Sequence, residues 1–333
     1  MRTIPPAVAV FFVLAGHAST PAAWVHRPIQ AAENSQYRLV ENWVHFPPEV
    51  TKWSQATGVD VDSHDNVFVF HRNELMPIMA FDTRGNFIRA WGRGMFKTTH
   101  FLRVDRSDAI WVTDRGYMEA FKFNREGKLL LTLGKQDVLG DNTSHDTFNG
   151  MADLAVMKNG DICVADGEGP NTRVAKFAKD GAFIKWWGGK GTEPGQFNMP
   201  HSIAVDSRDR IYVADRSNNR FQVFKPDGAF VKEVFVARNT LQNEGTVHAF
   251  AVSPDKEQKY LYIVDGSNKA IRILDRRTLE TLGSVGGHAG HNAREFFHIH
   301  DIAADSKGNL FLGEVNNGQR YYRYAFKGME SGR

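Results

Sequence analysis

The sequence predicts an all-β protein in which six copies of one strand-rich repeat form a six-bladed β-propeller. One observation is a pattern that recurs along the chain at intervals of roughly 40–50 residues, a spacing typical of propeller blades. A second is the period-two alternation of apolar residues within each copy, which indicates half-buried strands. Because a β-sandwich would not produce six matched copies, these observations favour the propeller.

Each copy reads apolar-x-apolar-Asp and then, after a short turn, apolar-x-Val-x-Asp or a close variant. The fourth copy is the clearest, with residues 203–206 (IAVD) followed by residues 211–215 (IYVAD). Asp-Gly pairs such as Asp180-Gly181 and Asp227-Gly228 separate the apolar runs, as expected for hairpin turns. The six copies are anchored at residues 58–70, 102–114, 154–166, 203–215, 250–265 and 302–313.

The sixth copy ends after its third strand, near Tyr324, and is one strand short of a complete blade. The segment 37–46 (YRLVENWVHF) resembles the outer strand of the other copies and precedes the first of them. We therefore expect this N-terminal strand to complete the last blade and close the ring, because closure removes exposed sheet edges.

The first residues of the chain differ from the repeats. Residues 1–23 combine Arg2, a short apolar run at 8–15 and the small residues Gly16 and Ala18 at positions −3 and −1 of a possible cleavage site, a combination typical of a secretory signal peptide. An N-terminal arm is the alternative, because Pro5 and Pro6 interrupt the segment. We expect a signal peptide at 1–23, a linker at 24–36 and the propeller at 37–333, in a secreted or periplasmic protein.

The composition excludes several classes of function. Charged residues make up 24% of the chain and the net charge is +3, without the dense basic patch that nucleic-acid binding needs. No later segment is apolar enough to cross a membrane. Cys163 is the single cysteine, so an intramolecular disulfide and a Cys-rich zinc site are excluded, and its apolar neighbours predict a buried side chain.

Histidines recur at one position of the repeat, five residues before its first Asp, where the chain enters the innermost strand. The residues at this position in copies one to six are Thr57, His100, Ala152, His201, His248 and His300. The histidines of copies two, four and six are related by a pseudo-threefold axis. Three neutral imidazoles that leave a fourth position for water or substrate form the usual catalytic zinc site. We expect zinc at His100, His201 and His300. For His248 the simpler interpretation is a buried polar side chain whose hydrogen bonds are satisfied within the protein.

Several segments resemble peptidyl-α-hydroxyglycine α-amidating lyases, propellers built from NHL-type repeats. These segments are 70–72 (FHR), 194–216, which includes 200–202 (PHS), and 300–302 (HDI), and the resemblance spans about 58–326. It implies a zinc-dependent lyase that splits a peptidyl-α-hydroxyglycine into a peptide amide and glyoxylate. It also implies a structural calcium held by Asp301 and the backbone carbonyls of Val59 and Leu102, since calcium prefers oxygen ligands.

The resemblance further implies that Arg72 and Arg216 face the substrate. A guanidinium offers a planar fork for a carboxylate. The chain departs from the family at Glu168, where a tyrosine is expected, so the base is Glu168 or a residue such as Tyr117 in the neighbouring loop. A second departure is His298, which stands where the family has methionine.

Two other functions are compatible with these residues. One is a metal-dependent hydrolase or lactonase on the same architecture, with Glu168 as base and calcium as the chief metal. The other is a non-catalytic propeller that binds peptide or protein over one face. For the lyase, the expected partner is a small-molecule or peptide substrate, and the sequence carries no signal for an oligomeric state.

Overall fold

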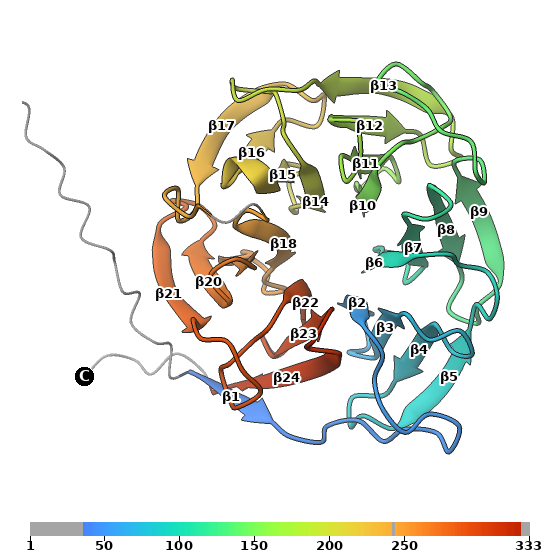
Figure 1. The fold of residues 1–333 in the computed structure, drawn as a ribbon, viewed down its shortest axis with the longest axis vertical. Coiled ribbons are helices and arrows are strands. Elements are labelled where there is room, and N and C mark those ends of the chain that lie inside the picture. The colour runs from blue at the N-terminus through green and yellow to red at the C-terminus, as the bar shows by residue number, and fades with distance from the viewer. Residues whose placement is uncertain (1–35, 242–243, 328–333) are drawn as a thin grey trace, which may run out of the picture. The chain divides into compact units, whose positions relative to one another are not determined.

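The structure, a computed structural model, describes residues 36–241 and 244–327. In these residues the chain forms 24 strands in six four-stranded antiparallel sheets, arranged radially around a central axis (Figure 1). The six-bladed propeller predicted from the repeat is therefore confirmed. The signal peptide expected at 1–23 and the linker, apart from its last residue, lie outside the described residues. Within the described part of the chain, no helix has the length and apolar character needed to span a membrane.

The strands follow one another from the axis outward in each of the first five blades. Blade 1 consists of β2 (Ala56–Val61), β3 (Val67–His71), β4 (Ile78–Phe81) and β5 (Phe87–Trp91). Blade 2 consists of β6 (Thr99–Val104), β7 (Ile110–Asp114), β8 (Glu119–Phe123) and β9 (Leu129–Leu133). Blade 3 consists of β10 (Met151–Val156), β11 (Ile162–Asp166), β12 (Arg173–Phe177) and β13 (Phe183–Gly188).

The second half of the ring repeats this order. Blade 4 consists of β14 (Pro200–Val205), β15 (Ile211–Asp215), β16 (Arg220–Phe224) and β17 (Phe230–Phe235), with the 3₁₀ helix η1 (Arg216–Asn218) after β15. Blade 5 consists of β18 (Val247–Val252), β19 (Tyr260–Asp265), β20 (Ala270–Asp275) and β21 (Thr281–Gly286). Blade 6 consists of β22 (Ile299–Ala304), β23 (Leu310–Glu314), β24 (Arg320–Phe326) and β1 (Tyr37–Val40).

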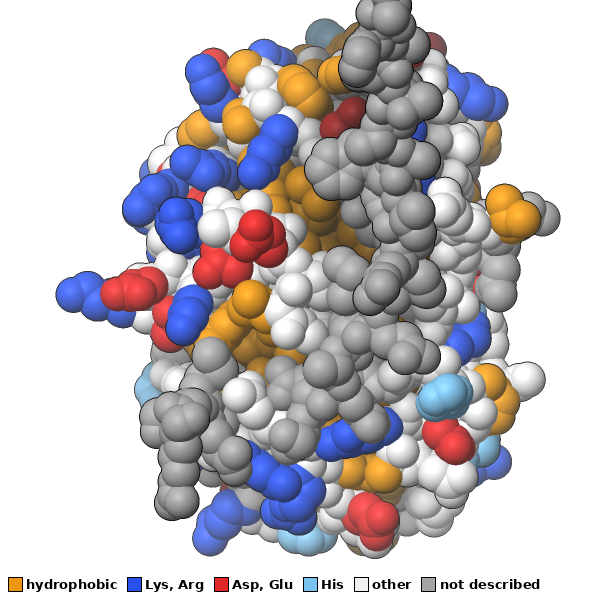
Figure 2. All heavy atoms as spheres, turned by 90° about the vertical axis from the view of Figure 1, so that its left-hand side faces the viewer, with side chains coloured by type: hydrophobic (Ala, Val, Ile, Leu, Met, Phe, Trp, Pro, Cys, Tyr) orange, Lys and Arg blue, Asp and Glu red, His pale blue; other side chains and the backbone are white. Residues whose placement is uncertain are grey.

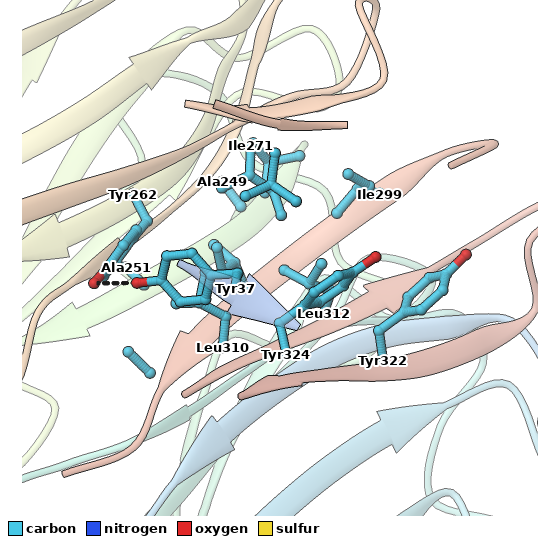
Figure 3. Close-up of a cluster of buried hydrophobic side chains, with 14 of the residues drawn as sticks. Tyr37, Ala249, Ala251, Tyr262, Ile271, Ile299, Leu310, Leu312, Tyr322 and Tyr324 are labelled. Atoms are coloured by element: carbon cyan, nitrogen blue, oxygen red, sulfur yellow. Dashed lines mark hydrogen bonds between the residues drawn. The ribbon is translucent and has the colours of Figure 1, made fainter. Parts of the chain in front are cut away.

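Blade 6 is completed by the N-terminal strand, as expected. β1 pairs antiparallel with β24, with Tyr37 opposite Phe326. The Tyr37 side chain is buried, and its hydroxyl forms a 3.0 Å hydrogen bond with the hydroxyl of Tyr262 in blade 5 (Figure 3). The strand is shorter than the segment 37–46, because a turn with Asn42 at φ 49° takes the chain out of the sheet. The next residue, Trp43, is buried against Phe81 and Phe311.

The innermost strand of every blade carries a β-bulge near its start. In blade 1 the register with the second strand shifts between Ala56 and Gly58, and in blade 2 it shifts between Thr99 and Leu102. The other four blades have an equivalent shift. A bulge changes the direction of a side chain within a strand. The position at which the histidines recur is the second residue of each innermost strand, within or beside this bulge.

One side of the ring carries mixed charge. In the view from the side of β17 and β21, basic, acidic and hydrophobic side chains are interspersed (Figure 2). This agrees with the small net charge of the chain.

Candidate metal centre and active site

In blades 2, 4 and 6, an acidic residue at the end of the second strand binds the backbone of the segment that precedes the candidate histidine. The carboxylate of Asp114, at the end of β7, accepts hydrogen bonds from the backbone N–H groups of Lys97 (2.8 Å) and Thr98 (2.9 Å). Asp215 accepts one from Asn198 (2.8 Å) in the same way, and Glu314 accepts one from His298 (2.9 Å). The acidic residue that closes the repeat motif therefore fixes the approach to His100, His201 and His300.

The three histidines meet on the axis. His100, His201 and His300 are buried, and one nitrogen of each lies within 4.8 Å of the others. The Nε2 atoms of His100 and His300 are 3.2 Å apart. The ring centroids are separated by 4.7 Å between His100 and His300, 5.2 Å between His100 and His201, and 5.3 Å between His201 and His300. The structure thus brings together the three residues that the repeat register singled out.

Each of these imidazoles has its second nitrogen held by a backbone carbonyl of the following blade. Nδ1 of His100 donates to Ala152 (2.9 Å), Nδ1 of His201 to His248 (2.7 Å), and Nδ1 of His300 to Thr57 (2.7 Å). The accepting carbonyls belong to the other three residues of the same register. Because a carbonyl only accepts, each Nδ1 carries a hydrogen, and in a neutral ring Nε2 is left with a lone pair.

Three Nε2 lone pairs therefore point at one buried location. Burial lowers the pKa of His201 well below its usual range, and the charge of Arg216 adds to this effect. Burial and the neighbouring His100 do the same for His300, so both rings are neutral near pH 7. Nε2 of His201 is buried without a hydrogen-bond partner in the described part of the chain. The donor set fits a divalent metal such as zinc, which binds neutral imidazole nitrogens held by such carbonyl contacts.

Glu168 lies beside this cluster, in the loop that follows β11. Its Oε2 atom is 2.6 Å from Nε2 of His100 and 4.0 Å from Nε2 of His201. Its Oε1 atom accepts a hydrogen bond from Arg115 at 3.1 Å. Burial alone would raise the pKa of Glu168, but the electrostatic and hydrogen-bond interactions with His100, together with the effects of His201 and Arg115, outweigh it and hold the pKa well below its usual range. A contact of 2.6 Å between two acceptor atoms requires a proton or a cation next to them.

Three arginines at one position of the repeat surround the mouth of the axis. Arg72, Arg115 and Arg216 each directly follow the second strand of their blade. Each donates its backbone N–H to the residue two positions before the histidine register: Gln55 (3.0 Å), Thr98 (3.0 Å) and Met199 (2.9 Å). The charge of Glu168 acts on both Arg72 and Arg216, whose pKa values burial lowers. Arg72 and Arg216 were expected at the site from the sequence, whereas Arg115 was not, although its shared position in the repeat was a visible signal.

Tyr117, His248 and His298 are the remaining residues that the sequence singled out near the site. Tyr117 lies in the turn between β7 and β8, with its ring 5.4 Å from the Lys97 ammonium, so its contacts are outside the imidazole cluster. The buried side chain of His248 approaches Gly245 through Nε2 (3.3 Å) and lies 5.3 Å, ring to ring, from His298. Nδ1 of His298 is 3.5 Å from Glu244.

The residues expected to hold calcium lie farther along the axis and do not fit that ion as they stand. Both carboxylate oxygens of Asp301 accept hydrogen bonds from Arg103, at 2.8 and 3.0 Å, and the carbonyl of Leu102 accepts a third at 2.8 Å. Val59 contacts Asp301 through its N–H group, at 2.9 Å. Both oxygens of Asp301 and the carbonyl of Leu102 are thus engaged by the guanidinium of Arg103, a residue that was not expected at this site.

Fold and site together define the class of this protein: a six-bladed propeller with a triad of buried imidazoles on its axis. The model of the NHL repeat matches residues 197–224. NHL repeat-containing protein 3 of Homo sapiens is 32% identical over 296 residues, which cover 85% of this chain and 82% of that protein. The chain belongs to the family of NHL repeat-containing propeller proteins that this relative represents.

The resemblance to amidating lyases is also confirmed. Peptidyl-alpha-hydroxyglycine alpha-amidating lyase 1 of Drosophila melanogaster is 28% identical, over 91% of this chain and 64% of that protein. Peptidylglycine alpha-amidating monooxygenase of Rattus norvegicus is 32% identical, over 83% of this chain but 31% of that protein, so the chain spans about a third of its length. Among solved structures, a streptogramin B lyase shares the fold, with a TM-score of 0.57 at 17% identity and 87% of both chains covered.

Proposed function

We propose that this protein is a zinc-dependent lyase that cleaves an α-hydroxyglycine-type carbinolamide into an amide and glyoxylate. The observation that carries the proposal is the set of three Nδ1–H···O=C hydrogen bonds, which leaves three Nε2 lone pairs converging on one point. The names of two relatives, an amidating lyase and an amidating monooxygenase, support the choice of reaction. The proposed site consists of His100, His201 and His300 with Arg72, Arg216 and Glu168 around them.

His100, His201 and His300 would hold the zinc ion, which supplies Lewis acidity toward a hydroxyl oxygen. Arg72 and Arg216 bind the substrate carboxylate through charge-assisted hydrogen bonds. Arg216 is 9% exposed and donates from Nε to the carbonyl of Glu244 at 2.6 Å, so its guanidinium is held in one orientation. A pocket of about 450 Å³ beside Arg72, lined by Phe96 and Thr99 among others, offers room for the acyl part of the substrate.

Glu168 accepts the hydroxyl proton of the substrate in this proposal. The C–N bond then breaks with its electron pair on nitrogen, the hydroxyl oxygen becomes the aldehyde oxygen of glyoxylate, and a proton is delivered to the amide nitrogen. No oxidant or second substrate is needed. Arg115 acts as a positioning residue, because its 3.1 Å hydrogen bond turns the carboxylate of Glu168 toward the histidines.

We also propose that the protein is secreted or periplasmic, with residues 1–23 removed as a signal peptide. The apolar run and small residues of this segment support that proposal. The protein to assay is therefore the chain that begins after residue 23.

The test is glyoxylate release from an N-acyl-α-hydroxyglycine by the zinc-loaded protein, compared among His201→Ala, Glu168→Gln and the control His64→Ala. His64 is a suitable control because its side chain is 62% exposed and contacts Asp108, the two residues lying in the turns between the first and second strands of blades 1 and 2. We expect release by the wild type and by His64→Ala, loss in His201→Ala, and a decrease of 10²–10⁴-fold in kcat for Glu168→Gln, which is the usual range for a general base.

Two results would contradict the proposal. Folded wild-type protein that holds zinc and releases no glyoxylate would exclude the reaction. Hydrolysis of a lactone by the same sample would then assign the site to the metal-dependent hydrolase that the sequence leaves open. Full activity of His201→Ala would exclude the imidazole cluster as the reaction centre.

A further inference from the structure

The propeller axis contains a second layer of charge beyond the histidines, built by the same inner strands. The residue after the histidine register is Asp153 in blade 3 and Asp301 in blade 6, and both side chains are fully buried. Two residues further along, the inner strands carry alanine in blades 3 to 6, but Asp60 in blade 1 and Arg103 in blade 2. The small alanines leave room on the axis, and Arg103 extends into it.

Arg103, in blade 2, joins blades 3 and 6, which are not neighbours of each other. From β6 it donates to both oxygens of Asp301 in β22, at 2.8 and 3.0 Å, and to Asp153 in β10, at 2.6 Å. Its guanidinium also lies 4.7 Å from the ring centroid of Phe101, which in turn contacts the rings of His201 and His300. The side chain is 14% exposed, so these are largely desolvated contacts.

The two carboxylates extend the network to further blades. Asp301 accepts the N–H of Val59 at 2.9 Å, and Asp153 accepts the hydroxyl of Ser202 at 2.8 Å and the N–H of Ile203 at 3.1 Å. Asp60 accepts the N–H groups of Val61 and Val104, each at 2.8 Å, and its charge also acts on Arg103. One cation is thus surrounded by three carboxylates and links blades 1, 2, 3, 4 and 6.

We propose that Arg103 is a built-in cation that takes the place of a structural calcium ion on the axis and makes the stability of this propeller independent of calcium. The oxygen atoms gathered here, carboxylate and backbone carbonyl, are those that calcium prefers. The guanidinium occupies them with directional hydrogen bonds and one positive charge, where a calcium ion would coordinate them and supply two. The inference does not depend on the proposed lyase reaction or on zinc.

Arg103 also bears on access to the site along the axis. On the far side of Arg103 lies a separate cavity of about 320 Å³, lined by Asp60, Arg103 and Val104 among others. Phe101 and Arg103 stand between this cavity and the imidazoles. We therefore expect substrate and product to use the end of the axis at which Arg72, Arg115 and Arg216 lie.

The experiment compares the wild type with Arg103→Ser, Arg103→Lys and a control, Arg106→Ser. Arg106 lines the same cavity but is exposed, so it tests for a general effect of removing a basic residue there. Each protein is passed into calcium-free buffer with a fixed zinc concentration. Calcium content is then measured by mass spectrometry, and thermal unfolding is recorded with 0 to 5 mM CaCl₂ (about a physiological to saturating range for weak sites).

We expect wild type, Arg103→Lys and Arg106→Ser to contain no stoichiometric calcium and to show the same Tm at every calcium concentration. Arg103→Ser leaves three buried carboxylates without a cation, which is expected to lower Tm by roughly 6–10 °C in calcium-free buffer. Calcium should recover at least half of that loss, with one ion bound per chain.

Two outcomes would overturn the proposal. One calcium per wild-type chain, or a wild-type Tm that rises with calcium, would show that Arg103 does not replace the ion. An Arg103→Ser protein that folds and gains neither calcium nor Tm would show that these carboxylates do not form a cation site. If Arg103→Ser does not fold, the wild-type calcium content and the Tm of Arg103→Lys still decide the question.

Discussion

The convergence of three imidazole lone pairs leads to a sharp prediction about His201→Ala and His248→Ala. The two histidines occupy the same position of neighbouring blades and both side chains are fully buried, so the substitutions create similar cavities. They differ in one respect: Nε2 of His201 points into the cluster, whereas His248 contributes its backbone carbonyl, which alanine retains. Zinc binding should therefore be lost in the first variant and kept in the second.

The expected magnitude follows from mass action. At free zinc about 1,000 times above Kd, binding to the folded state stabilises it by about 4 kcal/mol. For a chain of this size, 1 kcal/mol shifts Tm by about 2 °C, so zinc should raise the Tm of the metal-free wild type by roughly 8 °C. With His201 removed, an affinity at least 1,000-fold weaker leaves a rise of about 1 °C or less.

The assay is differential scanning calorimetry of metal-free protein with and without zinc, for wild type and both variants. We expect rises of roughly 8 °C for wild type and His248→Ala and about 1 °C for His201→Ala. Equal zinc-induced rises in the two variants would refute the reasoning, because the tautomer argument assigns the metal to His201 and not to His248. The absence of any rise in the wild type would refute the metal centre itself.

Three further predictions concern the scaffold. Tyr262→Phe leaves the buried hydroxyl of Tyr37 without its partner and should lower the free energy of unfolding by about 1–2 kcal/mol in urea, whereas an unchanged midpoint would show that this contact does not stabilise the closure. Burial raises the pKa of the Cys163 thiol to about 12, so a thiol reagent at pH 8 should label the protein only after unfolding, and rapid labelling of the native state would contradict its burial. Gly245→Ala should cost about 1–3 kcal/mol in the same urea assay, because Gly245 has φ 72° and a Cβ there would lie 1.8 Å from the carbonyl of Arg216.

Most of the fold was predictable because each repeat is specified by residues that are close together in the sequence. Alternating apolar residues and Asp-Gly turns fix each strand and hairpin, and six copies then fix the number of blades. The end of the closing strand was the exception. Residues 41–46 continue the strand-like pattern, but the turn at Asn42 removes Trp43 from the sheet and buries it between blades 6 and 1. Whether Trp43 continues the strand or leaves it depends on a cavity formed by residues far away in the sequence.

The convergence of His100, His201 and His300 was predictable for the same reason, since equivalent positions of a repeat lie at equivalent places around the axis. Arg115 and Arg103 show the limit of this reasoning. Arg115 shares its position with Arg72 and Arg216, but its contact with Glu168 joins the loops of two blades. The conformation of such loops does not repeat from blade to blade, so the repeat pattern does not predict this contact. Arg103 stands where four blades have alanine, yet its partners come from blades 3 and 6, a combination visible only once the ring is closed.

The closure of the ring by β1 has a consequence for how the chain can be cut and rejoined. The N–H of Lys327 donates to the carbonyl of Gln36 at 2.8 Å, so both ends of the propeller lie side by side in one sheet. Blade 6 can form only after β24 is synthesised, and the pairing of β1 with β24 is the most non-local among the described strands, a topology that slows folding. Joining residue 327 to residue 36 with a short linker, and opening the chain in an exposed turn such as the one at Asp227, would convert this pairing into a local hairpin. The blades would keep their cyclic order, while the step that closes the circle would move to another pair of strands.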